Sequence, residues 1–144
     1  MFKSILVPTD GSEITPKAIE HAVSLARLCG AGIEALCVTD PFPFSAVSEI
    51  QPIAPQDYFE LQEKLARQRV EVVAEACRAA GVGCTTTIVE ALHPYEAIID
   101  HANRQGCELI VMASHGRRGM SALLLGSETQ KVLTHSRVPV LVVR

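Results

Sequence analysis

The sequence alternates between two kinds of segment, and this alternation limits its fold more than any other feature. Short runs rich in Val, Ile and Leu are separated by longer stretches in which apolar residues recur at helical spacing. The expected strands are residues 4–7, 33–38, 85–89, 108–112 and 138–143, and the expected helices are 16–29, 56–80, 94–105 and 128–135. Strands that alternate with helices predict a parallel sheet covered by helices on both faces.

Local signals set the expected limits and faces of the helices. Thr15 followed by Pro16 is typical of a helix start, with Thr15 as the N-cap residue. A glycine follows the end of each of the first three helices, as is common after a helix. In the long helix the helical spacing of apolar residues predicts a buried stripe of Leu61, Leu65, Val72 and Ala76.

Composition agrees with a sheet buried on both faces. Aromatic residues make up only 4% of the chain and Trp is absent, so Val, Ile, Leu and Ala must build the core. The 144 residues suit one domain, 1–144, and an apolar content of 48% excludes intrinsic disorder. No run reaches the roughly 18 apolar residues of a membrane-spanning helix, and the N-terminus lacks a signal peptide, so we expect a cytoplasmic protein. The net charge of −3 argues against a general nucleic-acid binder.

Cysteines, histidines and prolines carry less functional information. The five cysteines form no C-x-x-C and the five histidines form no H-E-x-x-H, so we expect free, buried thiols and no metal site made of side chains alone. Half of the eight prolines fall between Pro41 and Pro55. This stretch cannot be a helix interior or a central strand, and it is interpreted as a long functional or mobile loop.

Two loops are the candidate binding elements. The first strand is followed by Asp10-Gly11-Ser12, and the fourth by Ser114-His115-Gly116. Ligands of open α/β sheets bind beyond the carboxyl ends of the strands where strand order reverses, so these loops face one crevice if the two strands are neighbours. Asp10 is then either an acceptor for a sugar hydroxyl or a metal, or a carboxylate that stabilises a turn.

The start of the last helix is the third candidate element. Exposed amides and the positive end of the helix dipole at Gly126-Ser127 make an anion site. The alternative is purely structural, because Ser127-Glu128-Thr129-Gln130 also reads as a capping box. Glu128 is itself an anion in the first turn, and Arg117, Arg118 and Lys131 could offset its charge.

With these residues in view, the chain resembles the universal stress proteins over essentially its whole length, from Ile5–Ser12 to Val138–Val143. Nucleotide-binding members of that family carry G-x2-G-x9-G-[S/T]. Here Gly116, nine residues and Gly126-Ser127 match the last three positions, whereas Ala113 replaces the first glycine. If that position required a positive φ, Ala113 would cost about 1–2 kcal/mol.

The resemblance implies a fold, a ligand and an assembly. The fold is a flavodoxin-like or Rossmann-like doubly wound α/β domain, with a five-stranded parallel sheet in the order 3-2-1-4-5. The ligand is ATP, or ADP or AMP, with Mg²⁺ possible on the phosphates. The residues it implies for the nucleotide are Pro8, Thr9, Asp10, Val38, Met112, Ala113, Ser114, His115, Gly116, Arg117, Gly119, Gly126, Ser127, Glu128 and Thr129. A homodimer forms through the last strand, whose residues are Val138, Pro139, Val140, Leu141, Val142 and Val143.

The sequence is compatible with three functions. The first is a dimeric nucleotide-binding regulator of the stress response, without robust catalysis and with an unidentified protein partner. The second is a slow ATP hydrolase or self-phosphorylating protein, which needs a base and a phosphate-neutralising group from among Asp10, His115 and Arg117. The third is an interaction module that works without nucleotide. A dinucleotide-dependent dehydrogenase is disfavoured, because no G-x-G-x-x-G follows the first strand.

Overall fold

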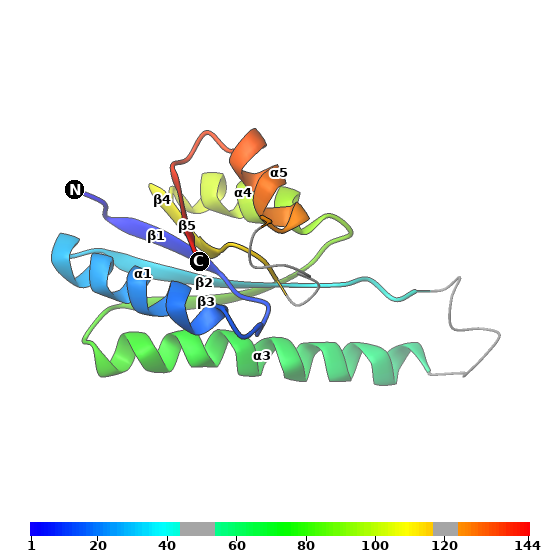
Figure 1. The fold of residues 1–144 in the computed structure, drawn as a ribbon. Coiled ribbons are helices and arrows are strands. Elements are labelled where there is room, and N and C mark those ends of the chain that lie inside the picture. Colours follow the sequence, from blue (N-terminus) through cyan, green and yellow to red (C-terminus); the bar gives the residue numbers. More distant parts are fainter. Residues whose placement is uncertain (44–53, 117–123) are drawn as a thin grey trace.

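The computed structural model describes residues 1–43, 54–116 and 124–144. Along these residues strands and helices alternate as the sequence predicts (Figure 1). In chain order the elements are β1 (Ser4–Pro8), α1 (Thr15–Cys29), β2 (Gly32–Thr39), α3 (Pro55–Ala79), β3 (Cys84–Glu90), α4 (Pro94–Gln105), β4 (Leu109–Ala113), α5 (Ser127–His135) and β5 (Val140–Val143).

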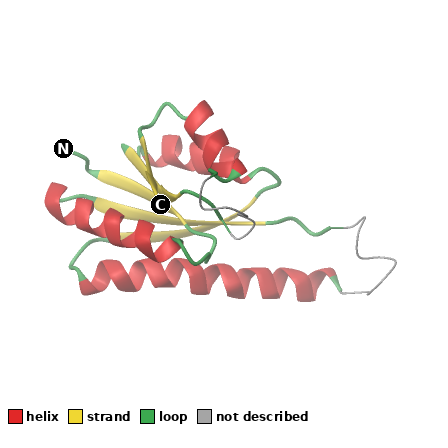
Figure 2. Cartoon of the chain, in the orientation of Figure 1, coloured by secondary structure: helices red, strands yellow, loops and turns green. Residues whose placement is uncertain are grey.

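The five strands form one parallel sheet in the order β3-β2-β1-β4-β5, which confirms the predicted topology. The helices α1 and α3 lie on one face of this sheet, and α4 and α5 lie on the other (Figure 2). Strand order reverses between β1 and β4, the two strands that begin the two halves of the sheet. Their carboxyl ends therefore mark the expected position of a ligand site.

The sheet divides the core into two aliphatic layers. Ile5, Val7 and Val111 pack toward α1 and α3, whereas Leu6 and Ile110 pack toward α4 and α5. The central strands β1 and β4 are buried on both faces, as expected of continuous aliphatic runs. The edge strands differ, because Thr85 and Thr86 of β3 are exposed. Burial on both faces thus explains the aromatic-poor composition at the centre of the sheet but not at its edges.

Some predicted boundaries were wrong by one or two residues. Thr15 is the first residue of α1, and Ile14 occupies the N-cap position. The Thr15 hydroxyl donates instead to Asp10 Oδ1 at 3.3 Å, so it supports the preceding loop rather than the helix start. Val138 and Pro139 precede β5, which begins at Val140.

The predicted buried stripe of α3 was wrong for Leu61 and Val72, whereas Leu65 is half-buried and Ala76 packs against the core. The side chains that α3 buries are Ala66, Val70, Val73 and Cys77. Leu61 and Val72 are instead 54% and 53% exposed. The helix carries apolar residues on two adjacent faces, and its N-terminal part extends past the ends of the strands (Figure 1). Helical spacing alone cannot tell which of the two faces meets the sheet.

Two neighbouring valines test this correction. Replacing Val73 by Ala is expected to lower the free energy of unfolding by about 2 kcal/mol, because the lost methyl groups leave a cavity in the core. Replacing Val72 by Ala is expected to change it by less than about 0.5 kcal/mol, because this side chain is half exposed and Ala favours a helix. Urea denaturation measures the free energy of unfolding of both variants. Equal losses would contradict the observed face of α3.

Candidate functional site

The loops that follow β1 and β4 meet at the carboxyl edge of the sheet. β1 and β4 are paired neighbours, with Ile5 opposite Leu109 and Leu6 opposite Ile110. Beyond their ends, Gly116 lies so close to Asp10 that a Cβ at Gly116 would overlap the Asp10 carboxylate. The sequence-predicted convergence of these two loops is therefore present in the structure. Gly116 is needed for this close approach and not for a positive φ.

The two carboxylate oxygens of Asp10 have different surroundings. Oδ1 accepts hydrogen bonds from the Ser12 amide at 2.9 Å and from the Thr15 hydroxyl at 3.3 Å. The Thr15 hydroxyl also lies 2.9 Å from the Ser12 hydroxyl. Oδ2 is the atom that faces Gly116 across the crevice. Asp10 therefore does stabilise the turn, as the structural alternative requires, and it also presents an oxygen to the ligand edge of the sheet.

Ala113 occupies an unstrained position. It is the last residue of β4, is paired with Val143 of β5, and has a negative φ. The 1–2 kcal/mol penalty expected for Ala at a positive φ therefore does not arise. Ser114, next along the chain, is buried, and its amide donates to the Val143 carbonyl at 2.8 Å. The end of β4 is thus held firmly against β5.

Gly126 joins the start of α5 to the end of β4. Its amide donates to the Ser114 carbonyl at 2.7 Å, so this amide is already used within the protein. A Cβ at Gly126 would lie 3.0 Å from His115 Cα and 3.4 Å from His115 Cβ. The backbone at Gly126 is extended, with φ of −61° and ψ of 151°. Glycine is required here because two backbone segments approach each other closely.

The capping-box alternative is not realised. Ser127 is the first residue of α5 rather than its N-cap, and α5 has no side-chain cap hydrogen bond. The first amides of a helix have no acceptor within the helix. The amides of residues 127–129 therefore stand at the positive end of the α5 dipole, directly after Gly126, which packs against His115. This arrangement favours the anion-site interpretation of Gly126-Ser127.

The side chains of Glu128 and Thr129 are occupied elsewhere. Glu128 Oε2 accepts from the Tyr95 amide at the start of α4 at 2.8 Å, and Oε1 lies 3.3 Å from Lys131 Nζ. The buried Thr129 hydroxyl donates to the Ala113 carbonyl at 3.0 Å. Glu128 is thus partly neutralised and turned toward α4, which lessens its repulsion of an anion at the start of α5. Both residues can offer the crevice their backbone amides.

The remaining predicted residues are scattered around this edge. Pro8 ends β1, and the amide of the buried Thr9 donates to the Leu36 carbonyl at 2.8 Å. Val38 is half-buried near the end of β2. Met112 is buried in the layer beneath α4 and α5 rather than in the crevice. Arg117 and Gly119 lie outside the described residues.

Sequence reasoning missed one residue beside this edge. Arg69 of α3 lies over Gly11, where a Cβ would stand 3.0 Å from Arg69 Nε. Gly11 also has a φ of +74°, so both space and backbone conformation require glycine. The +74° conformation fits the turn signal after the first strand. Nothing in the sequence indicated that α3 would place an arginine on this turn.

The cysteines lie in the interior of the protein or are partly buried at its surface. None of the five cysteines forms a disulfide. Cys37, Cys77 and Cys107 are buried as expected of structural thiols, whereas Cys29 and Cys84 are only half-buried. Burial raises the pKa of the Cys84 thiol to about 12, with a further contribution from the neighbouring Cys77. Within the described ranges, no three His, Cys, Asp or Glu side chains are placed to hold a metal ion.

A pair of glycines tests the packing at the start of α5. Replacing Gly126 by Ala is expected to lower the free energy of unfolding by about 1–3 kcal/mol, because the new methyl meets the His115 backbone. Replacing Gly32 by Ala should leave stability unchanged or slightly raised, because its nearest neighbour would be the Gly83 carbonyl at 3.7 Å. Thermal unfolding of the two variants makes the comparison. Equal stability would mean that the β4–α5 junction is looser than described.

Comparison with known proteins identifies the family. All of residues 1–144 match the sequence profile of the Universal stress protein family. The chain belongs to the universal stress protein family. One relative is the universal stress protein MJ0531 of Methanocaldococcus jannaschii, which is 31% identical over 100% of this chain and 83% of its own length.

Solved structures agree with this assignment. The protein MJ0577 of the same organism superposes with a TM-score of 0.84 and 31% identity, over 99% of this chain and 96% of that one. A universal stress protein from Archaeoglobus fulgidus, solved in complex with dAMP, has a TM-score of 0.71 and 19% identity, over 99% and 98% of the two chains. The doubly wound fold is therefore shared. In the described part of this universal stress protein no helix is long and apolar enough to cross a membrane.

Proposed function

We propose that this universal stress protein binds ATP, or ADP or AMP, at the carboxyl edge of its sheet and acts as a dimeric regulator in the stress response. The observation that carries the proposal is the meeting of Asp10, Gly116 and the uncapped start of α5 at the strand-order reversal. A carboxylate oxygen suits the ribose hydroxyls, and helix amides suit the phosphates. The dAMP complex of the Archaeoglobus protein is a property of that relative, and it supports the choice of an adenine nucleotide.

The residues present fit such a ligand. The ribose would be held at Asp10 Oδ2, and the phosphates by the amides of residues 127–129. Gly116 and Gly126 carry no side chain that could block the crevice between them. The phosphates would supply the oxygens for Mg²⁺, because no cluster of three ligating side chains exists among the described residues.

Dimerisation through β5 is part of the proposal. β5 pairs with β4 on one side only, and its residues Val140, Leu141 and Val142 are partly or substantially exposed. The opposite edge strand β3 instead exposes threonines. An apolar edge strand is prone to pair with another chain. In a closed two-fold dimer, the β5 strands of the two copies would pair with each other and satisfy the backbone groups of both edges.

We further propose that the protein binds nucleotide without robust turnover. Phosphoryl transfer requires a positioned base together with a cation on the phosphates. Asp10 Oδ1 is engaged by Ser12 and Thr15, and His115 Nδ1 lies 3.2 Å from the Ser114 hydroxyl. Neither the hydrogen bonding of Asp10 nor that of His115 indicates a general base positioned next to a phosphate.

Nucleotide analysis of the purified protein, followed by calorimetry with ATP, ADP and AMP, tests the proposal. Binding of at least one of the three is expected, with no hydrolysis on the timescale of the titration. Absence of binding at millimolar nucleotide would favour an interaction module that works without nucleotide. Sustained phosphate release would instead favour the slow hydrolase.

A further inference from the structure

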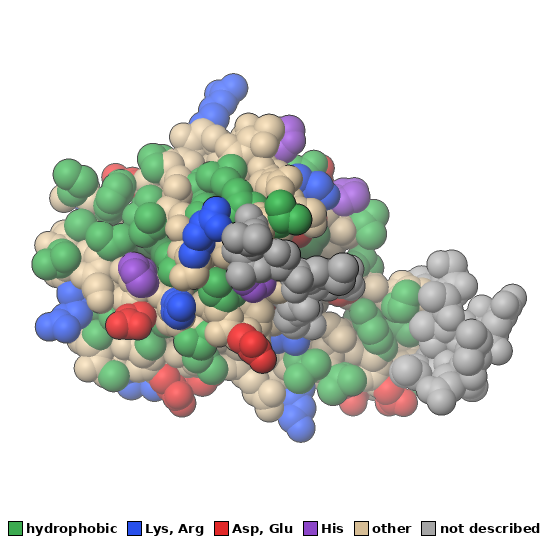
Figure 3. All heavy atoms as spheres, viewed as in Figure 1, with side chains coloured by type: hydrophobic (Ala, Val, Ile, Leu, Met, Phe, Trp, Pro, Cys, Tyr) green, Lys and Arg blue, Asp and Glu red, His purple; other side chains and the backbone are tan. Residues whose placement is uncertain are grey.

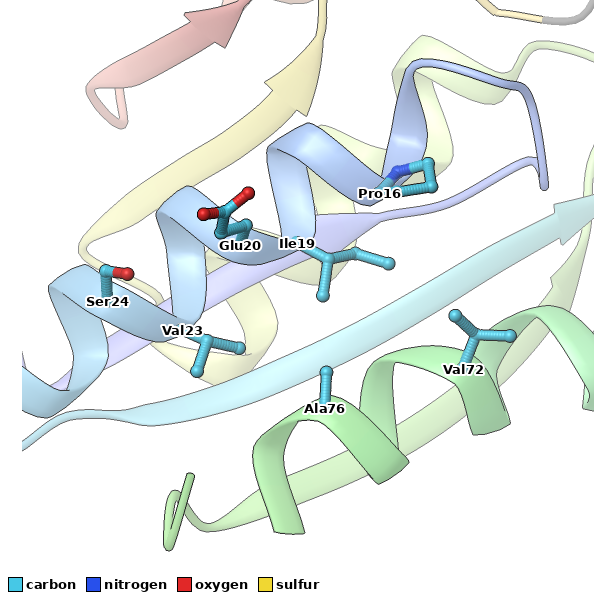
Figure 4. Close-up of a pocket in the computed structure, with 7 residues that line it drawn as sticks. All are labelled: Pro16, Ile19, Glu20, Val23, Ser24, Val72 and Ala76. Atoms are coloured by element: carbon cyan, nitrogen blue, oxygen red, sulfur yellow. The ribbon is translucent and has the colours of Figure 1, made fainter. Parts of the chain in front are cut away.

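A groove runs between α1 and α3, and one end of it adjoins the β1–α1 loop that carries Asp10. It consists of two adjoining hollows of about 340 and 310 Å³, which share Pro16, Ile19 and Val72. In Figure 4, Ile19 and Val23 of α1 point toward Val72 and Ala76 of α3 across the first hollow. Apolar side chains are also visible between charged ones on this face in Figure 3. Each hollow has the size of a small-molecule site.

The end of this α1/α3 groove beside the β1–α1 loop is polar. The second hollow is lined there by Thr9, Ser12, Thr15, Gln68 and Arg69. The hydroxyls of Ser12 and Thr15 lie 2.9 Å apart, and Thr15 also donates to Asp10. These two hydroxyls are therefore engaged, and the guanidinium of Arg69 is the charged donor left at this end.

Arg69 stands out among the arginines of α3. Arg67 pairs with Glu63 and Arg78 pairs with Glu71, whereas Arg69 has no ion pair or hydrogen bond among the described residues. Its side chain is half-buried and held against Gly11. A half-buried cation that has no carboxylate partner in the described part of the chain is suited to an anion from outside the protein.

We propose that the α1/α3 groove binds a free medium-chain carboxylate, with its carboxylate on Arg69 and its aliphatic chain along Ile19, Val72 and Ala76. The planar guanidinium matches a carboxylate through two parallel hydrogen bonds. The first hollow is lined mostly by apolar side chains, with Glu20 and Ser24 on its α1 side, so an aliphatic chain has a surface to cover. Arg69 is the cation at the other end, and Glu20 disfavours the reverse orientation of a carboxylate. This proposal does not rest on nucleotide binding, because it is argued from the α1 and α3 side chains and from Arg69, although the second hollow also touches the β1–α1 loop.

The test is a titration of the full-length protein with decanoate below its micelle concentration, followed by the NMR methyl signals of Ile19, Val23 and Val72. Saturable shifts of these signals are expected, and decanol, which lacks the charge, should bind at least about tenfold more weakly. Arg69→Gln should weaken decanoate binding by roughly tenfold to a hundredfold, whereas Arg67→Gln on the same helix should change it by less than about twofold.

A second variant separates the groove from its charged end. Val72→Asp places a carboxylate in the α1/α3 groove at a position that is half exposed. The protein should therefore stay folded, and it should lose decanoate binding because the new carboxylate repels the ligand and interrupts the apolar lining. Absence of saturable shifts in the wild-type protein, or equal affinities of Arg69→Gln and wild type, would overturn the proposal. Methyl shifts that depend on protein concentration without any probe would overturn it too, because a second copy would then occupy the groove. None of these readouts involves nucleotide, so the two proposals can fail independently.

Discussion

Replacing Asp10 by Asn is expected to weaken adenine-nucleotide binding by roughly tenfold to a hundredfold while leaving the fold intact. Asn retains an oxygen that can accept from the Ser12 amide and the Thr15 hydroxyl, so the β1–α1 loop should persist. It replaces Oδ2, the oxygen that faces Gly116, with an NH₂ donor and removes the charge. A hydrogen bond to a charged group contributes about 1.5–3 kcal/mol, which corresponds to this range of affinity.

Calorimetry with ATP and AMP measures the loss, and Asp100→Asn is the matched control. Asp100 is an exposed carboxylate on α4, so its replacement should leave the affinity unchanged. Asp10→Ala is less informative, because it also removes the acceptor of the Ser12 amide and would loosen the turn. If the Asn variant binds nucleotide as tightly as wild type, Asp10 serves the turn alone and another group must hold the ribose.

The sequence predicted a parallel sheet because strands and helices alternate, and the family resemblance supplied the strand order on which the meeting of the two loops depends. Alternating strands and helices determine which strands are parallel, and the reversal of strand order then places Asp10 and Gly116 at the same edge. The limits of α4, Pro94–Gln105, were also confirmed, because a proline and a glycine mark its ends. Local chemistry was sufficient for the limits of this helix.

Other features depend on how elements pack, which spacing does not encode. Val72 and Val73 are adjacent and chemically identical, yet only Val73 faces the sheet. Arg69 reaches Gly11 because α3 crosses beside the β1–α1 loop, and a pattern on α3 alone cannot reveal that neighbour. Likewise, Ser127-Glu128-Thr129-Gln130 fits a capping box, but the Glu128 carboxylate binds the Tyr95 amide of another helix.

Replacing Val142 by Pro is expected to weaken dimerisation through β5 by roughly a hundredfold or more without disrupting the sheet. The carbonyls of Pro139 and Val143 accept from the amides of Ile110 and Ser114, at 2.9 and 2.8 Å. Because successive residues of a strand alternate in direction, Val140 and Val142 turn their amides and carbonyls to the open edge. Proline at Val142 therefore removes a donor that β4 does not use, and proline is tolerated at such edge positions.

In a two-fold interface this donor is lost twice, and each loss leaves an acceptor on the partner without its hydrogen bond. At about 1–3 kcal/mol for each such acceptor, dilution should dissociate the variant dimer at a protein concentration roughly a hundredfold higher than that at which the wild-type dimer dissociates, or higher still. Expressed as a dissociation constant of the dimer, the expected change is an increase of roughly a hundredfold.

Val142→Thr is the control, because it keeps the amide and the β-branched shape. Sedimentation equilibrium measures the dissociation constants, and thermal unfolding checks that both variants retain the β4–β5 pairing. A folded proline variant that dimerises like wild type would place the contact between copies on another surface, and a wild-type chain that stays monomeric at all concentrations would contradict dimerisation itself.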